Sequence, residues 1–319
     1  VRQFLNGEIL LSECLFIILL AADFFLPMRL LGSFFHIAMN GMAASDKIFK
    51  LLDLPEPVKG TREISKESGL CCKDLTFAYE KERPILKQVG FSARKGDFVA
   101  IVGESGCGKS TLASIFTGKN RNYQGKVLLG GAQGVPLSEI SEESLLEQIT
   151  YVGHAGYLFK GTVRENLLLA KPDGTDEEFW QVLEQMKLAD FLRSEQGLDT
   201  MLAEKGSNFS GGQCQRLVMA RALLHDSPVY IFDEATSNID AESENDIMEQ
   251  IYQMKGKKTV LLISHRLANV IAADKIYVME QGKIAEQGNH EALIAQNGSY
   301  AKLWNTQQEL EDYRKEKAS

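Results

Sequence analysis

The chain has 319 residues, 44% of them hydrophobic and 24% charged, with a net charge of −8 and a sequence pI of about 5.3. This composition is typical of a globular protein with one large domain or two smaller ones. An acidic chain without a long basic run lacks the electrostatic footprint of a nucleic-acid binder, so we exclude DNA and RNA as main partners. The five cysteines indicate neither a zinc site nor a disulfide framework, because none has metal-ligand spacing with a histidine and two of them, Cys71 and Cys72, are adjacent.

The first predicted element is a membrane-spanning helix. Residues 9–31 are apolar over about the 20 residues that cross a bilayer. A signal peptide would need a basic opening region and a small-residue cleavage site, and the sequence has neither. Glu13 and Asp23 indicate neighbouring helices, since carboxylates inside a membrane usually face a bundle interior or a watery cavity. A buried helix of a soluble domain is the alternative.

The helical pattern continues to residue 54, where Pro55 and Pro57 break it and open a polar stretch that reaches Gly69. We therefore predict part of a membrane domain at residues 1–54, a linker at 55–69 and a second domain at 70–306. A charged tail follows at 307–319. Because the chain begins with Val1 instead of methionine, we expect it to be part of a longer protein.

The second domain reads as a mixed α/β fold. Strand patterns lie at residues 70–79, 88–93, 97–102, 125–130, 149–152, 228–232, 259–264, 275–279 and 283–286. Helical patterns lie at 110–118, 141–148 and 241–254, with a helical insert at 162–224 that opens with capping boxes at Thr162 and Thr175. The first two strands predict an antiparallel layer. The later alternation of strands and helices predicts a parallel sheet.

The loop between the third strand and its helix carries the strongest motif. Residues 103–110 (GESGCGKS) match the phosphate-loop pattern G-x-x-x-x-G-K-[ST] at every fixed position. Its glycines let backbone N–H groups turn toward phosphate oxygens at a helix N-terminus. Lys109 can reach the β- and γ-phosphates, and Ser110 can bind Mg²⁺. The predicted nucleotide-binding residues are Gly103, Glu104, Ser105, Gly106, Cys107, Gly108, Lys109, Ser110 and Thr111.

Two carboxylates follow the apolar strand at 228–232. Asp233 and Glu234 taken alone are commonplace at a strand end, but a phosphate loop upstream makes them candidates for an ATPase site. Asp233 would hold Mg²⁺, and Glu234 would orient and polarise the attacking water. The predicted cofactors are therefore ATP and Mg²⁺.

The stretch 209–213 (FSGGQ) closely resembles the LSGGQ signature of ABC ATPases, with Phe209 where leucine is usual. The other family motifs occur in the expected order: Tyr79 as the adenine-stacking aromatic, a D-loop at 235–240 that ends in Asp240, and His265 as the switch histidine. Residues 157–166 are similar to a segment of ABC exporters. The resemblance covers about residues 70–305 and implies a P-loop NTPase fold of the ABC type, with an antiparallel β layer and a helical subdomain. It assigns His265 to the γ-phosphate and the attacking water.

The signature also indicates a partner. Ser210, Gly211, Gly212 and Gln213 open a helix, which makes a second anion-binding surface that a single site with its own phosphate loop does not need. The resemblance implies a second ABC subunit, identical or paralogous, whose nucleotide meets this signature. Membrane helices of the same transporter would be the further partners.

One position departs from the family pattern. His154 stands where ABC ATPases usually carry the Q-loop glutamine, which contacts Mg²⁺ and water. An imidazole is a poorer Mg²⁺ ligand than an amide oxygen. We expect hydrolysis to persist with His154 in this catalytic and metal role, but with weaker metal coupling.

The resemblance as a whole implies an ATP-hydrolysing subunit of an exporter-type half-transporter in the cell (inner) membrane, with its ATP-binding domain in the cytoplasm. Near Pro27, residues 26–29 and 32–36 look like bacterial thiol (cysteine or glutathione) exporters of the cytochrome-assembly type. Four alternatives stay open: a soluble ABC ATPase without transport, an import ATPase that docks on separate membrane subunits, a module that only senses ATP, and a partner with a degenerate site in a heterodimeric transporter.

Overall fold

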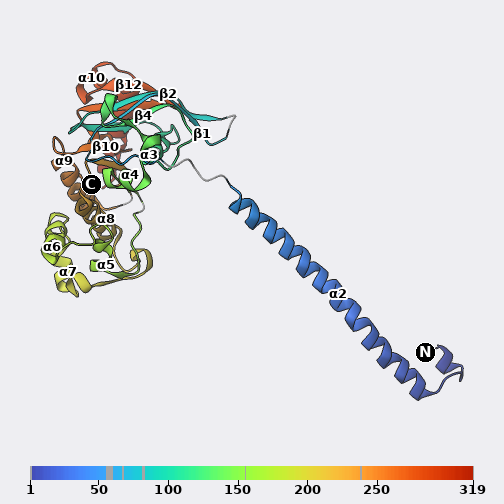
Figure 1. Ribbon diagram of the computed structural model, residues 1–319. Helices are drawn as coiled ribbons and strands as arrows, with labels where there is room; N and C mark the ends of the chain where they lie inside the picture. Colours follow the sequence, from blue (N-terminus) through green and yellow to red (C-terminus); the bar gives the residue numbers. More distant parts are fainter. Residues whose placement is uncertain are drawn as a thin grey trace. The chain divides into compact units, whose positions relative to one another are not determined.

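The computed structural model describes residues 2–54, 60–66, 68–80, 83–154, 156–237 and 239–318. Contacts within the chain divide it into two units, residues 1–57 and 58–319. The division falls inside the predicted linker, of which residues 55–59 and 67 lie outside the described part of the chain. Each unit is coloured by sequence in Figure 1 and is described separately.

The N-terminal unit consists of a short helix α1 (Arg2–Leu5) and a long helix α2 (Leu11–Leu52), which continues through Pro27. None of the residues of α2 is buried, and an 18-residue window within it reaches a mean hydropathy of 2.1. By length and composition α2 could cross a membrane. Glu13 has a local role, because its carboxylate accepts a hydrogen bond from the Leu10 N–H (2.8 Å) at the start of the helix.

The centre of the second unit is a six-stranded sheet in the order β12-β11-β3-β10-β9-β6. Five strands run parallel, and β12 pairs antiparallel to β11. The strands are β3 (Phe98–Val102), β6 (Ile149–Gly153), β9 (Val229–Asp233), β10 (Thr259–Ile263), β11 (Lys275–Glu280) and β12 (Lys283–Gly288). Every residue of β3, β9 and β10 is buried, as expected for parallel strands covered on both faces. The predicted parallel sheet is confirmed.

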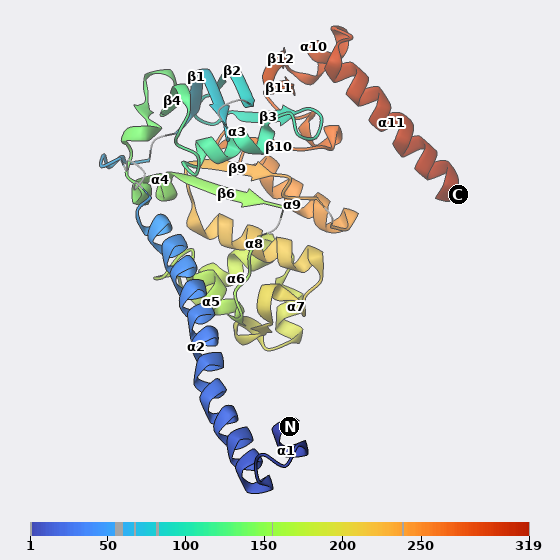
Figure 2. The ribbon, with the colours of Figure 1, turned by 90° about the vertical axis from the view of Figure 1, so that its right-hand side faces the viewer.

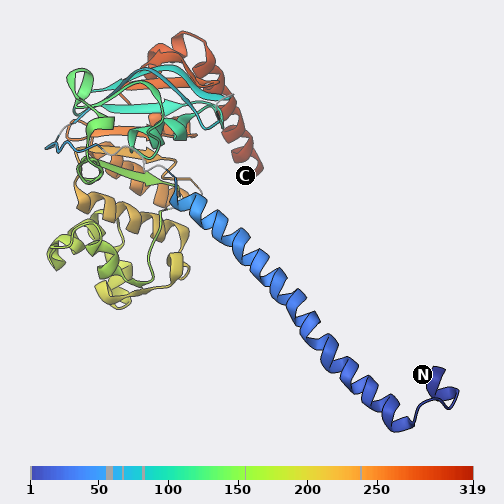
Figure 3. The same cartoon turned by 45° about the vertical axis from the view of Figure 1, so that its right-hand side comes forward.

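An antiparallel layer covers one face of this sheet. It has the order β2-β1-β4-β5, with β1 (Leu70–Ala78), β2 (Pro84–Ala93), β4 (Gln124–Leu129) and β5 (Val135–Pro136). Val99 and Ile101 of β3 face the core shared with this layer and with α3 (Lys109–Phe116), whereas Phe98 and Ala100 face the other core. Figures 2 and 3 show the layer (teal to green) on the opposite side of the sheet from α8 and α9 (orange-brown).

The other face of the sheet is covered by two helices that flank β9 in the sequence. These are α8 (Gly211–His225) and α9 (Ala241–Gln253), with a subdomain of α5 (Val163–Leu168), α6 (Asp176–Gln185) and α7 (Ala189–Ser194) beyond α8. Both predicted capping boxes form. The hydroxyls of Thr162 and Thr175 each accept a hydrogen bond from the backbone N–H three residues later, and the glutamate at that position accepts one from the threonine N–H. A two-stranded sheet of β7 (Gly161–Thr162) and β8 (Met201–Leu202) interrupts the predicted helical insert.

Two edges of the second unit differ from the expected linker and tail. Gly60 lies so close to the backbone of Glu139 that a Cβ there would stand 2.3 Å from its carbonyl carbon, and Arg62 donates its N–H to the Glu139 carbonyl. This part of the predicted linker, beside α4 (Glu142–Gln148), therefore contacts the domain. At the other end, α10 (His290–Ala295) precedes α11 (Ser299–Ala318), so the predicted charged tail continues a helix. The Gln, Glu and Lys residues of this predicted tail are good helix formers, which is why α11 extends through it.

Candidate active site

The predicted phosphate loop joins β3 to α3 at the carboxyl edge of the parallel sheet, where ligands of such sheets bind. Gly103, Gly106 and Gly108 all have positive φ, at 145°, 78° and 110°. A Cβ at Gly103 would stand 2.2 Å from the Met279 carbonyl oxygen. The three glycines are therefore required by the backbone itself, which supports the reading of this stretch as an anion cradle.

Lys109 is the buried cation of this loop, with 4% of its surface exposed. Its ammonium group donates to the carbonyl oxygens of Gly103 (2.8 Å) and Glu104 (2.9 Å) and lies 3.9 Å from the Cys107 sulfur. Burial raises the pKa of the Cys107 thiol, and the neighbouring Lys109 opposes that rise. The Lys109 ammonium group therefore donates to carbonyl oxygens of the phosphate loop itself, and it could donate instead to a phosphate bound in that loop.

Asp233 ends β9 beside the phosphate loop and accepts two hydroxyl hydrogen bonds. Ser110 donates to one carboxylate oxygen (3.2 Å), and Tyr151 donates to the other (3.1 Å). The register of β6 on β9 places Gly153 opposite Asp233, and the Tyr151 ring lies against Gly153. Burial and the Asp233 carboxylate raise the pKa of the Tyr151 phenol, which keeps it a proton donor. Tyr151 is a site residue that the motifs did not indicate.

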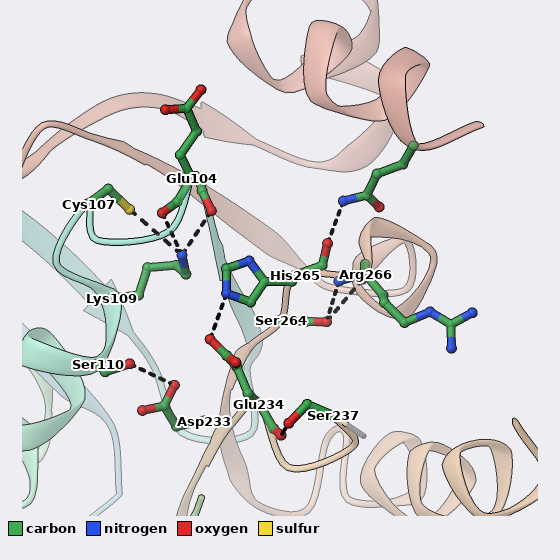
Figure 4. A network of polar contacts seen from close by, with 12 residues as sticks. Glu104, Cys107, Lys109, Ser110, Asp233, Glu234, Ser237, Ser264, His265 and Arg266 are labelled. Carbon is green, nitrogen blue, oxygen red and sulfur yellow. Dashed lines mark hydrogen bonds and ion pairs between the residues drawn. The ribbon is translucent and has the colours of Figure 1, made fainter. Parts of the chain in front are cut away.

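Glu234 and His265 form the second polar pair of the site. Nε2 of His265 lies 2.7 Å from Oε1 of Glu234. Glu234 takes a left-handed backbone conformation (φ 54°), an uncommon state for a residue other than glycine that is often found at functional sites. Its N–H bonds to the Ile263 carbonyl of β10, and its own carbonyl accepts from Ser237. Figure 4 shows His265 between the phosphate loop and Glu234, with Ser110 and Asp233 beside them.

A cavity of about 230 Å³ brings together part of the predicted phosphate loop, Tyr79, Glu234 and His265. Its lining consists of Tyr79, Ile85, Ser105, Gly106, Gly108, Lys109, Ser110, Thr111, Glu234 and His265. Tyr79 is largely exposed at its edge, packs edge-to-face on Phe77 (4.9 Å) and accepts a hydrogen bond from Asn120. An exposed aromatic ring beside a phosphate loop is suited to stack on a nucleotide base. The arrangement can therefore hold a nucleotide, with a carboxylate and an imidazole next to its phosphates.

Comparison with known proteins agrees with this geometry. Residues 86–237 match the family described as ABC transporter. An uncharacterized ABC transporter ATP-binding protein of Haemophilus influenzae is 47% identical over 315 residues, which are 98% of this chain and 56% of that protein. The chain belongs to the ABC transporter family. Membership implies that the domain binds and hydrolyses ATP.

Two further relatives indicate the exporter branch of the ABC transporters. An ATP-dependent lipid A-core flippase of Haemophilus ducreyi is 41% identical, covering 88% of this chain and 49% of its own length. The solved structure of a bacterial Atm1-family ABC exporter with ATP bound is similar with a TM-score of 0.76 and 29% identity, covering 94% of this chain and 53% of that one. The chain thus spans about half the length of the relatives it matches.

The ABC signature does not line the cavity of its own chain. Ser210 caps α8, where its hydroxyl accepts from the Gln213 N–H (3.2 Å) and the Gln213 side chain accepts from the Ser210 N–H (2.9 Å). Phe209, in the usual leucine position, packs edge-to-face on Phe191. A Cβ at Gly212 would stand 2.1 Å from the Ser243 hydroxyl. Gly212 is therefore needed for the close approach of α8 to the start of α9.

The D-loop end contributes to the same approach. Asp240 caps α9 by accepting hydrogen bonds from the Ser243 N–H (2.8 Å) and hydroxyl (2.7 Å), which lower the pKa of Asp240. The position 238 of the D-loop lies outside the described residues.

His154 follows β6 directly and is exposed. It does not belong to the lining of the cavity, and among the described residues its ring has no hydrogen-bond partner. The preceding residue is fixed, because the Gln215 side chain of α8 donates to the Gly153 carbonyl (3.2 Å). The structure does not bring His154 into the cavity lining, so its metal role stays a prediction.

Proposed function

We propose that this chain is the ATP-hydrolysing part of an export-type ABC transporter of the cell membrane, paired with a second ABC subunit. The names of the relatives, a lipid A-core flippase and an Atm1-family exporter, support export as the direction of transport. Helix α2, which could cross a membrane, supports a membrane location for the N-terminal unit. The observation that carries the hydrolytic function is the Glu234–His265 pair in a cavity whose floor is the phosphate loop.

The oxygen atoms beside the phosphate loop fit Mg²⁺. The Ser110 hydroxyl and the Asp233 carboxylate are hard oxygen donors only 3.2 Å apart, and Mg²⁺ prefers such ligands together with substrate phosphates. Bound Mg²⁺ would neutralise charge on the phosphate oxygens. Tyr151 would keep the second carboxylate oxygen of Asp233 fixed while Ser110 turns toward the ion.

The remaining residues of the cavity have separate roles in this proposal. Lys109 exchanges its carbonyl partners for β- and γ-phosphate oxygens, which are stronger acceptors. Glu234 orients and polarises the attacking water, and His265 keeps the Glu234 carboxylate in place and donates toward the γ-phosphate. Tyr79 stacks on the adenine.

The signature of each subunit completes the site of the other in this proposal. The first residues of α8 do not line the chain's own cavity, and an anion held by a second subunit would accept from the N–H groups of Gly211 and Gly212, which the capping box leaves free. His154 would reach Mg²⁺ and water only in this closed state. If His154→Gln leaves the Mg²⁺ dependence of hydrolysis unchanged, His154 has no such role.

The test of the proposed function is Glu234→Gln in the intact protein, purified in detergent. We expect ATP hydrolysis to fall about 100-fold or more, because the group that positions water is lost, while ATP binding persists. Glu242→Gln, an exposed acid in the first turn of α9, is the matched control and should leave both unchanged. Full hydrolysis in Glu234→Gln would contradict the proposal. An intact protein that hydrolyses ATP and stays soluble without detergent would favour the soluble ABC ATPase instead.

The narrower resemblance to thiol exporters stays a prediction. It is checked by adding cysteine or glutathione to the reconstituted protein and measuring the ATPase rate, which a transported thiol should raise.

A further inference from the structure

The switch histidine lies in a short loop that side chains hold from two directions. The loop leaves β10 at Ser264, whose hydroxyl accepts from the Arg266 N–H (3.0 Å) and donates to the Arg266 carbonyl (3.1 Å). Arg266 also pairs with Glu244, a carboxylate of α9 that is 5% exposed. These contacts fix the residue after His265. None of these contacts involves the carbonyl oxygen of His265, which has a different hydrogen-bond partner.

That partner is Gln307 of the last helix, 42 residues further along the chain. Its side-chain Nε2 donates to the His265 carbonyl oxygen, and its Oε1 accepts from the Leu267 N–H (2.9 Å). One amide group thus uses both its donor and its acceptor on the two residues that flank Arg266. A planar amide engaged at both ends fixes the peptide groups on either side of the loop more tightly than a single hydrogen bond.

Helix α11 is anchored well enough for Gln307 to act as a fixed point. Glu286 of β12 accepts hydrogen bonds from the N–H groups of Ser299 and Tyr300 at the start of the helix. Tyr300 is fully buried and its hydroxyl bonds to the His290 ring (2.9 Å). Trp304 packs edge-to-face on the same ring (4.7 Å). Gln307 follows Tyr300 by two helical turns, so it lies on the same face of α11.

We propose that Gln307 is a positioning residue for ATP hydrolysis, which makes the C-terminal helix α11 a working part of the catalytic switch. Gln307 acts on the main chain of His265 and so keeps Nε2 within reach of Glu234, 2.7 Å away. Its removal leaves the phosphate loop and Tyr79 in place, so nucleotide binding persists while turnover slows. The inference rests on the proposed catalytic role of His265.

The experiment compares Gln307→Ala with Gln308→Ala in the intact protein. Gln308 is the adjacent, similarly half-buried residue of α11, and its side chain makes no hydrogen bond among the described residues. We expect Gln307→Ala to lower kcat by about three- to tenfold, as the loss of one or two net hydrogen bonds predicts. KM, the affinity for ATP and the thermal midpoint should stay near wild type. Gln308→Ala should match wild type in all four.

A second variant removes only the donor. Gln307→Glu keeps an oxygen for the Leu267 N–H but places a carboxylate against the His265 carbonyl, so its kcat should fall at least as far as in Gln307→Ala. A kcat equal to wild type in either variant overturns the proposal. Loss of ATP affinity together with kcat also overturns it, since that result would assign Gln307 a general structural role.

A double substitution separates this inference from the function on which it rests. If Gln307 acts through His265, adding Gln307→Ala to His265→Ala should cause no further loss in single-turnover hydrolysis. An equal further loss would show an independent effect and overturn the inference alone. An active His265→Ala protein would instead contradict the proposed role of His265, whatever Gln307 does.

Discussion

Two helices of the ATP-binding domain begin with glycine-rich turns, and they begin differently. Helix α3 starts after Gly108, which has φ 110° and no side-chain cap, so its first N–H groups are open to a ligand. Helix α8 starts at Ser210 with a complete capping box, so side chains of the same chain already satisfy part of its N-terminus. The open start lies in a cavity with Lys109, and the capped start lies outside that cavity. In the function proposed above, the start of α3 would bind phosphate held by the chain's own loop, and the start of α8 would meet nucleotide held by a partner.

The largest expected effect, on ATP affinity, comes from adding a side chain at Gly108, the residue before α3. In Gly108→Ala a Cβ would lie 2.8 Å from the Leu86 side chain, at a φ that costs other residues about 1–2 kcal/mol. We expect ATP affinity, measured by equilibrium binding, to fall about tenfold or more and hydrolysis to fall with it. Gly256→Ala is the control, because Gly256 has a similarly positive φ (79°), open space around it and no part in the cavity. Equal ATP affinity in the two variants would mean that the open start of α3 does not hold the nucleotide.

A smaller effect should come from removing the cap of α8. Ser210→Ala and Thr175→Ala each delete a capping-box hydroxyl, from α8 and α6 respectively, and each should cost about 1 kcal/mol of unfolding free energy. Only Ser210→Ala should also reduce hydrolysis, by about tenfold, because its hydroxyl would contact nucleotide in the partner's site. Thermal unfolding and ATPase rates measure the two effects separately. Equal ATPase rates in both variants would show that Ser210 caps α8 and does not contact a partner's nucleotide.

The sequence predicts the phosphate loop and the residues that face it better than the long-range contacts that hold them in place. The phosphate loop, Asp233, Glu234 and His265 were found because each follows a strand of recognisable pattern, and parallel strands bring their carboxyl ends together. The Tyr151 contact depends on the register of β6 against β9, which no local pattern reveals. The Gln307 contact depends on the path of α11 back toward the sheet, and a Gln- and Glu-rich segment reads as a solvated tail when only its composition is considered.

The smallest expected effect concerns the two thiols at these helix starts, Cys107 before α3 and Cys214 in the first turns of α8. Burial raises the pKa of both thiols above the ordinary value of 9.0, and Lys109 opposes the rise only at Cys107. Raised pKa values leave little thiolate at neutral pH, so alkylation of each thiol should be slow there, and the rate of alkylation should still increase above pH 9.0.

These rates are measured in proteins that keep only Cys107 or only Cys214, with the other four cysteines changed to serine. Labelling with N-ethylmaleimide is then followed by mass spectrometry. Because only Cys107 lies under the open phosphate loop, ATP should slow its labelling several-fold and affect Cys214 less. Protection of Cys214 without protection of Cys107 would reverse the assignment of the open and capped helix starts.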